Sequence, residues 1–302
     1  MNFSEMKDTV IRKIRGSRKD VALVLSSGGA RGLIHIGAIE ELENRGYHIH
    51  SIAGTSIGAL IAGMYATGHL KEFKQWMTTI DHKRILQLTD FSPAIDHIVK
   101  GHRIIQAIKE IVPDINIEDL SIPYSAVATN LQTGHEVVFN RGSLYSAIRA
   151  SISLPAFFEP VTMGDKILID GGITNPLPLN RVSRIKGDLL VAVNVCGHDY
   201  AGQTQMQQYI EQRKLENSLL RQLLRKIFPN RHETPYNYYT LINRTASIMI
   251  HQNAKLSIRL TPPDILLDIA MKRHGGFDYD KSERLIAIGR RRMKRALDNY
   301  ES

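Results

Sequence analysis

The sequence predicts an α/β protein with a mainly parallel central sheet. Two successive units of strand, turn and helix run through residues 21–68, and this repeat is typical of parallel sheets. Uninterrupted apolar runs at 21–26 and 188–196 are typical of strands that are buried on both faces. The chain has 302 residues, 43% of them hydrophobic, which is enough for a sizeable core.

The first unit begins with the apolar run VALVLS at 21–26 and continues through a glycine-rich turn, SGGARG, at 27–32. A helix is predicted at 33–46, because apolar residues recur there at helical spacing and a glycine ends the pattern. The second unit repeats this order, with a strand at 48–54 and a helix at 57–68. The recurring apolar residues of the first helix are Leu33, Ile36, Ile39 and Leu42.

The pattern continues up to residue 200. Residues 70–120 are predicted to be mainly helical, most clearly in GHRIIQAIKEIV. Further strands are predicted at 124–131, 135–140, 166–170 and 188–196, and a helix at 143–153 ends before Pro155.

The character of the sequence changes after residue 200. Residues 203–228 form a long amphipathic pattern with basic side chains, residues 228–240 are predicted to be a loop, and residues 279–297 a basic terminal helix. No internal repeat interrupts this order.

Charge divides the chain in a similar way. The net charge is +9; residues 201–302 hold 18 basic and 10 acidic residues and residues 1–20 hold six and three, which leaves −2 for residues 21–200. We therefore expect a basic N-terminal segment, 1–20, and one domain, 21–302, with a motif-bearing core at 21–200 and a basic, mainly helical region at 201–302. Basic ends suit an anionic partner such as a membrane surface, a nucleic acid or an acidic substrate, and equally a solvated basic face.

The number of cysteines indicates the cellular compartment in which the protein is expected. Cys196 is the single cysteine, so no intrachain disulfide can form, and this fits a reducing compartment. Residues 1–20 are charged throughout and lack the apolar run of a signal peptide. These features predict a cytoplasmic protein.

A membrane-spanning helix is an alternative for residues 51–70. The window contains no charged residue, and Gly54 and Gly58 form a GxxxG pattern. However, it also holds several glycine, serine and threonine residues and begins with a run typical of a strand. We favour a strand followed by a helix.

Ser56 is a candidate nucleophile. A serine hydroxyl needs a base and an exposed position, and a G-x-S-x-G turn between a strand and a helix provides the exposure. Gly54, Ser56 and Gly58 lie in this context, between the predicted strand and helix of the second unit. The alternative is that Ser56 caps the helix.

The turn SGGARG is a candidate oxyanion hole. Glycines let backbone N–H groups approach a substrate closely, and such groups stabilise the charge that develops in acyl transfer. The run Gly28, Gly29, Gly32 matches neither a dinucleotide-binding loop nor a phosphate-binding P-loop. Arg31 is expected to hold the loop, to face a phosphate head group or to form an ion pair at the start of the helix.

Asp170 is a candidate general base. It ends an apolar strand and precedes Gly171 and Gly172, a position from which it can accept the proton of Ser56. A simple Asp-Gly-Gly turn is the alternative. The apolar segment ASISLPAFFEPV at 150–161 is expected to line an acyl pocket or to pack in the core. The histidines are scattered without a metal-binding pattern, so no metal or cofactor is expected.

Taken in order, these stretches resemble the patatin-like phospholipase family, especially its bacterial members of about 300 residues. SGGARG is similar to the oxyanion motif G-G-G-x-R-G of this family, GTSIG to its nucleophile elbow, DGG to its catalytic D-G-G/A, and ASISLPAFFEPV to the block before it. The resemblance covers residues 21–200. It departs at Ser27, which replaces the first glycine; if this position requires a positive φ, serine carries a strain of about 1 kcal/mol.

The resemblance implies a three-layer α/β/α fold and a Ser–Asp dyad without histidine. Ser56 would be the nucleophile and Asp170 the base. The oxyanion hole would comprise backbone N–H groups of Gly28, Gly29, Ala30, Arg31 and Ile57. Fatty acyl esters of lipids would be cleaved through an acyl-enzyme, as in phospholipases A and lysophospholipases, without a cofactor.

Two other functions remain as alternatives. An α/β-hydrolase with a Ser–Asp–His triad would use His198 or His274, although that fold usually places several strands before its nucleophile and only two precede Ser56 here. A lipid-binding regulatory module without activity would also suit the basic ends.

The segment LLRQLLRKIF at 219–228 has one apolar face flanked by basic residues. Such a helix can lie on an anionic membrane, here on its inner face, or pack on the core of the chain or on a second subunit. Expected partners are therefore a lipid acyl ester and an anionic membrane surface, and no nucleic acid; an oligomer is left open.

Overall fold

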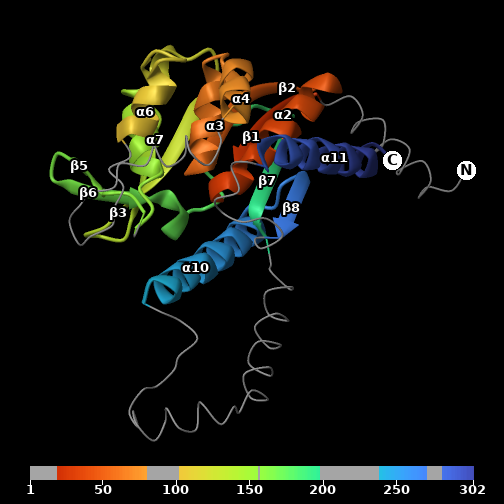
Figure 1. The fold of residues 1–302 in the computed structure, drawn as a ribbon. Helices are drawn as coiled ribbons and strands as arrows, with labels where there is room; N and C mark the ends of the chain where they lie inside the picture. The colour runs from red at the N-terminus through yellow and green to blue at the C-terminus, as the bar shows by residue number, and fades with distance from the viewer. Residues whose placement is uncertain (1–18, 80–101, 156, 198–237, 271–280) are drawn as a thin grey trace, which may run out of the picture.

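A computed structural model describes residues 19–79, 102–155, 157–197, 238–270 and 281–302 (Figure 1). The described strands form one eight-stranded sheet in the order β5-β6-β3-β2-β1-β7-β8, with β4 paired to β3. The strands are β1 (Asp20–Leu25), β2 (His48–Thr55), β3 (Tyr124–Asn130), β4 (Glu136–Phe139), β5 (Val161–Met163), β6 (Lys166–Asp170), β7 (Leu189–Gly197) and β8 (Ile265–Ala270).

Helices lie in several of the connections between these strands and after the last strand. The α-helices are α2 (Leu33–Asn44), α3 (Ile57–Ala66), α4 (Leu70–Thr78), α6 (His102–Lys109), α7 (Leu144–Ser151), α10 (Tyr238–Leu260) and α11 (Ser282–Glu301). Short 3₁₀ turns are η1 (Gly29–Gly32), η2 (Ile117–Asp119) and η3 (Gly171–Ile173).

The sheet is mainly parallel, as predicted. Strands β3, β2, β1, β7 and β8 pair in parallel, whereas β4 and β6 pair antiparallel with β3, and β5 antiparallel with β6. The antiparallel strands are confined to one side of the sheet. A parallel centre of this kind must be covered on both faces, because its strands carry apolar side chains on both sides.

The two faces of the sheet have separate cores, which gives the expected three-layer α/β/α architecture. In β1, Val21, Leu23 and Leu25 pack in a large core with α2, α3, α7 and α11. Their neighbours Ala22 and Val24 point to the opposite face, where α10 packs. Both sets are fully buried, as the continuous apolar run predicts for a strand that has no solvent-facing side.

The membrane-spanning interpretation of residues 51–70 is wrong. This window is divided between the end of β2, the turn at Ser56 and α3, which has only 10 residues. Its lack of charge reflects burial, because β2 lies inside the sheet and α3 in the core. Among the described residues, no helix is both long and apolar enough to cross a membrane.

Strands β5 and β8 were not predicted, and α10 was expected only in general terms, as part of the mainly helical region at 201–302. The loop predicted at 228–240 is wrong for Tyr238–Thr240, which begin α10, and the rest of it lies outside the described residues. Strand β5 has only three residues, and the apolar residues of α10 do not follow one narrow stripe. The predicted helix at 219–228 also lies outside the described residues, as do 80–101 of the helical region.

The C-terminal helix α11 lies across α2 at very short range. A Cβ atom at Gly37 would overlap the backbone of α11 at Ile286, and a Cβ atom at Gly289 would overlap the backbone of α2 at Ile34. The two glycines therefore set the distance between the helices. Helix α11, which lies far from the motifs in sequence, thereby completes the main core.

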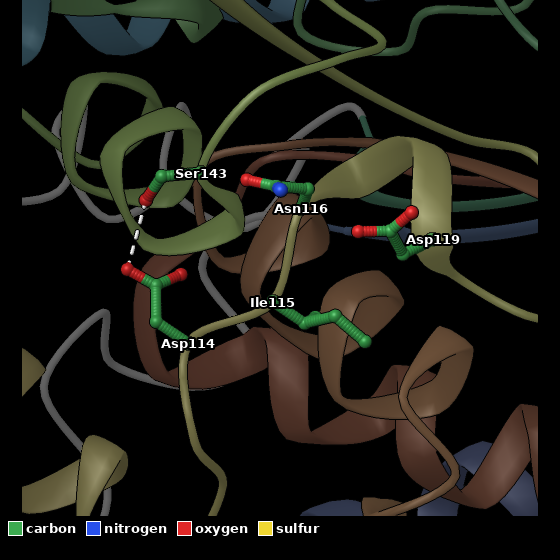
Figure 2. A pocket seen from close by; sticks show the side chains of 5 residues that line it. All are labelled: Asp114, Ile115, Asn116, Asp119 and Ser143. Carbon is green, nitrogen blue, oxygen red and sulfur yellow. Dashed lines mark hydrogen bonds between the residues drawn. The ribbon is translucent and has the colours of Figure 1, made fainter.

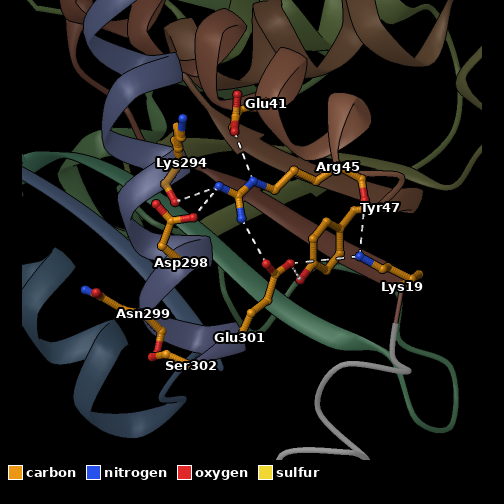
Figure 3. Close-up of polar contacts among 9 residues, drawn as sticks. All are labelled: Lys19, Glu41, Arg45, Tyr47, Lys294, Asp298, Asn299, Glu301 and Ser302. Carbon is orange, nitrogen blue, oxygen red and sulfur yellow. Dashed lines mark hydrogen bonds and ion pairs between the residues drawn. The ribbon is translucent and has the colours of Figure 1, made fainter.

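Ion pairs fix the end of the same helix pair (Figure 3). Arg45 follows α2 and donates to Glu41 at 3.1 Å and to Glu301 at 2.9 Å, and it also bonds to Asp298. These carboxylates raise the pKa of Arg45 above its usual value. Tyr47 donates to Glu301 at 3.0 Å, and Lys19 lies 3.9 Å from the same carboxylate, so Glu301 is held by three residues that lie far from it in sequence.

The helix crossing predicts a cost for a small substitution. Gly289→Ala should lower the free energy of unfolding by about 1–3 kcal/mol, because the added methyl group overlaps the carbonyl of Ile34. This cost outweighs the gain of about 1 kcal/mol in helix propensity. Urea denaturation measures the difference. Asn299→Ala, at an exposed position of α11, is the control; if both variants were equally stable, close packing would not set this crossing.

Candidate active site

Ser56 lies on the turn between β2 and α3. Its φ of 58° and ψ of −125° make it the one non-glycine residue with positive φ in the described part of the chain. Such a backbone conformation costs about 1–3 kcal/mol and persists only where the surroundings hold it. Although Ser56 occupies the N-cap position of α3, its side chain makes no capping bond. The capping interpretation is therefore wrong.

The hydroxyl of Ser56 instead donates to a carboxylate. Its Oγ lies 2.6 Å from Oδ2 of Asp170, which is only 2% exposed. The other carboxylate oxygen, Oδ1, accepts the N–H of Gly172 at 2.7 Å and thereby caps η3. Asp170 therefore makes both contacts at once. Its Oδ1 holds the Asp-Gly-Gly turn, and its Oδ2 accepts from Ser56.

Strand β3 explains how the two residues meet. Strand β4 pairs with residues 126–129 of β3 on one side, so β2 and β6 must both lie on the other side. Thr55 of β2 pairs with Val127, and Asp170 of β6 pairs with the next residue, Ala128. Because β2 runs parallel and β6 antiparallel to β3, their carboxyl ends face each other.

Burial changes the acidity of the carboxylate. Desolvation raises the pKa of Asp170 from its usual value of 3.8 to about 6, against the opposite effect of the hydrogen bonds from Ser56 and Gly172. A carboxylate with this pKa is ionised at neutral pH and more basic than an exposed one. It is suited to accept a proton from a hydroxyl group.

The glycines of the two motifs permit close backbone packing. A Cβ atom at Gly54 would overlap the backbone of Gly58, and one at Gly58 would overlap the carbonyl groups of Leu25 and Ser26. A Cβ atom at Gly171 would overlap the carbonyl of Val127. These glycines hold the turn of Ser56 against β1 and β3, so they position the serine through the backbone.

The glycine loop lies at the start of α3. Gly28 precedes η1, Gly29 has a φ of 58°, and a Cβ atom at Gly32 would overlap the side chain of Ile57. In the part of the chain that the structure describes, no hydrogen-bond partner is found for the N–H groups of Gly28 and Gly29. Buried Arg31 holds the loop, since its Nε donates to the carbonyl of Gly28 at 3.0 Å.

The serine at the first position of the loop is not strained. Ser27 is absent from the described residues with positive φ, so the strain considered above does not arise. Its N–H donates to the carbonyl of Pro176 at 2.9 Å. Its carbonyl accepts from Cys196 at 2.8 Å, and the carbonyl of Ser26 accepts from Nε2 of His35 at 2.9 Å.

Sequence reasoning missed these supports of the loop. His35 was not singled out, and Cys196 was considered only for disulfides. Burial lowers the pKa of His35 to about 4, so the ring is neutral at physiological pH and its Nε2–H can donate to Ser26. No sequence pattern identifies either residue, because their partners are backbone carbonyls brought close by the fold.

Ser151 is a further residue that sequence reasoning left without a role. It ends α7 and lies in the segment 150–161 that was expected to line a pocket or the core. Its Oγ accepts the N–H of Ser56 at 2.8 Å and donates to the carbonyl of Val127 at 2.6 Å. The fully buried hydroxyl therefore ties the strained turn to β3.

A surface depression lies elsewhere, beside the start of α7 (Figure 2). Ser143 caps this end of α7, and its Oγ donates to Asp114 at 2.9 Å. Ser151 ends the same eight-residue helix, about 12 Å away. The depression is therefore separate from the site of Ser56. It is lined by Asp114, Ile115, Asn116, Asp119 and Ser143.

The described residues contain no group of three or more histidine, cysteine, aspartate or glutamate side chains that could hold a metal ion. Ser56, on a turn between a strand and a helix and bonded to a buried carboxylate, has the geometry expected of a nucleophile elbow in an α/β protein. The family model "Patatin-like phospholipase" matches residues 23–182, more than half of the chain. The protein therefore belongs to the patatin-like phospholipase family.

The chain is also similar in sequence to curated proteins, among them an NTE family protein, a lysophospholipase and an esterase. An uncharacterized NTE family protein of Mycobacterium tuberculosis is 44% identical over 188 residues, which are 62% of this chain and 52% of that protein. Lysophospholipase NTE1 of Candida glabrata is 32% identical over 63% of this chain and 11% of that protein. Neuropathy target esterase sws of Drosophila melanogaster is 30% identical, over 59% and 13% respectively.

The matched part of the chain thus spans about half the length of the mycobacterial relatives and less of the others. Among solved structures, VipD from Legionella pneumophila is similar with a TM-score of 0.46 and 15% identity, over 94% of this chain and 67% of that one. A likeness this remote carries no argument about function.

The tie through Ser151 can be tested. Ser151→Ala leaves the N–H of Ser56 and the carbonyl of Val127 without this partner, and should lower the free energy of unfolding by about 1–3 kcal/mol. Ser146→Ala, at an exposed position of the same helix, is the matched control. Equal thermal stability of the two variants would contradict the importance of this hydroxyl.

Proposed function

We propose that the protein is a serine lipid acyl hydrolase of the phospholipase A or lysophospholipase type. The observation that carries this proposal is the 2.6 Å hydrogen bond from Ser56 to buried Asp170, on a chain of the patatin-like phospholipase family. In this proposal Ser56 is the nucleophile and Asp170 the general base.

The reaction would proceed in two halves. Asp170 accepts the proton of Ser56 while Oγ attacks the carbonyl carbon of the ester, and the resulting oxyanion is stabilised by N–H groups of the glycine loop. Gly28 and Gly29 are the first candidates for these donors. Collapse of the intermediate passes the proton from Asp170 to the leaving alcohol and leaves an acyl group on Ser56. Water then attacks this acyl-enzyme while Asp170 accepts a proton from it, and collapse of the second intermediate breaks the bond to Oγ, returns the proton to Ser56 and releases the fatty acid.

The contact geometry favours a dyad over a triad. In a triad an imidazole lies between the carboxylate and the serine, but here Ser56 donates to Asp170 directly. Among the described residues, no histidine forms a hydrogen bond with Ser56 or Asp170. The two histidines considered for a triad, His198 and His274, lie outside the described residues.

Lipid esters are the proposed substrate class. The family name and the names of two relatives, a lysophospholipase and an esterase, support this choice. Because such substrates reside in bilayers or micelles, we also propose peripheral contact with an anionic membrane, which the net charge of +9 would favour.

Replacing the nucleophile gives the direct test. Ser56→Ala should lower the hydrolysis of a p-nitrophenyl acyl ester and of a lysophospholipid at least about 1,000-fold, because no other group can form the acyl-enzyme. The control Ser121→Ala, an exposed serine, should retain activity. Binding to lipid without product release by the unaltered protein would instead favour a non-catalytic lipid-binding module.

The acidity of Asp170 predicts a pH profile. With a pKa of about 6, the carboxylate is ionised above this pH and protonated below it. The value of kcat/KM should therefore be constant above about pH 7 and fall about tenfold per pH unit well below pH 6. A limb at pH 4 or lower would show that Asp170 is not the base.

The same pKa predicts an effect on stability. Because folding raises the pKa above 3.8, the folded state favours the neutral carboxyl group, so charged Asp170 destabilises the fold above pH 6. Asp170→Asn should abolish activity yet raise the free energy of unfolding at pH 7 by about 1–3 kcal/mol. This gain should disappear below the usual pKa of 3.8. The exposed control Asp165→Asn should change neither quantity.

A further inference from the structure

Helix α10 combines basic charge with an uncovered apolar face. Its 23 residues include no aspartate or glutamate, but they include Arg244, Lys255 and Arg259. Its inner side packs on the sheet through Ala254, which is fully buried, and partly buried Ile250. The helix thus rests on the sheet along only one side, and the composition of its other side needs an explanation.

The outer side of α10 carries most of the exposed large apolar side chains of the described residues. Five of the eight exposed large hydrophobic side chains among the described residues lie on α10. At 100° per residue these five fall within about one third of the helix circumference, opposite Ala254. Polar Thr245, Gln252 and Arg259 lie in the same sector, so the five side chains form an interrupted apolar stripe. Exposed large apolar side chains gathered in this way mark an interaction surface. The stripe consists of Leu241 (51% exposed), Ile248 (49%), Met249 (43%), Leu256 (51%) and Leu260 (74%).

The helix lies against the candidate active site. Asn253 donates to the carbonyl of Ile173 at 2.7 Å, in the 3₁₀ turn that directly follows Asp170. His251 bonds to the carbonyl of Cys196 at 3.0 Å, near the carboxyl end of β7. The N-terminal half of α10, which precedes these contacts, extends away from the sheet (Figure 1). Leu241, Ile248 and Met249 belong to this half.

We propose that the outer face of α10 docks on an anionic phospholipid bilayer. The apolar stripe would enter the boundary between head groups and acyl chains, while Lys255 and Arg259 meet anionic head groups. Charge complementarity favours a bilayer over a second copy of this chain, since two copies of a helix without acidic residues would repel each other. This inference rests on the proposed function in one respect, namely that the same bilayer would supply the lipid ester for hydrolysis. The docking itself requires no catalysis.

Binding is tested with the full chain carrying Ser56→Ala, so that the vesicles remain intact. The variant Ile248→Gln is compared with Ile185→Gln, because both isoleucines are about half exposed, at 49% and 50%. Ile185 precedes β7, at the end of the sheet opposite the carboxyl end of β2. On vesicles of phosphatidylcholine with phosphatidylglycerol, sedimentation should give about fivefold weaker binding for Ile248→Gln and no change for Ile185→Gln.

A second pair tests the charge. Lys255→Glu with Arg259→Glu should weaken binding more than about tenfold. Arg291→Glu with Arg295→Glu makes the same charge change on α11 and should leave binding nearly unchanged. Phosphatidylcholine vesicles alone should bind the unaltered protein weakly.

Each other outcome overturns the proposal. Equal losses in the members of a pair would mean that binding follows net charge or fold, not α10. A dimer in sedimentation equilibrium that Ile248→Gln dissociates, without a change in vesicle binding, would assign the stripe to a second copy. Because the assay uses Ser56→Ala protein, failure of the hydrolase proposal would leave the binding result unchanged.

Discussion

One edge of β3 carries two strands end to end, and the rest of the site depends on this arrangement. Val127 pairs with the end of β2, and Ala128 pairs with the end of β6. The strands approach from opposite directions, so the residues at their carboxyl ends meet. Ser56 and Asp170 are thereby brought to 2.6 Å from each other although 114 positions separate them in sequence.

Two features of the contact between Ser56 and Asp170 are energetically unfavourable, and the surrounding hydrogen bonds and packing compensate for them. Ser56 adopts a strained backbone, and Asp170 is buried where its charge is disfavoured. The hydroxyl of Ser151 and the N–H of Gly172 hold the two residues in place, and Gly54, together with its partner Gly58, allows the backbone to close around them. A rigid surrounding of this kind is what a positioned nucleophile and base require.

The described residues cover the two faces of the sheet unequally. One face carries several helices and a large core that α11 completes through its glycine crossing with α2. The other face has a small core, and α10 contacts it along one side only. The first face contains most of the packing that stabilises the fold. On the second face, α10 exposes apolar side chains and contacts the turn that follows Asp170.

Much of this could be predicted from the sequence, because the determining signals are local. The continuous apolar run of β1, the glycines around Ser56 and the Asp-Gly-Gly turn act within a few residues, and they indicated the parallel α/β class and the candidate pair. The antiparallel pairing of β6, the tie from Ser151 to Ser56 and the exposed stripe of α10 could not be predicted this way. Strand partners, buried hydroxyl contacts and the uncovered side of a helix depend on which distant segments lie together. By itself, the sequence therefore determined most of the elements and the candidate chemistry. Only the tertiary structure decided their contacts, because those contacts join residues through space and leave no local pattern.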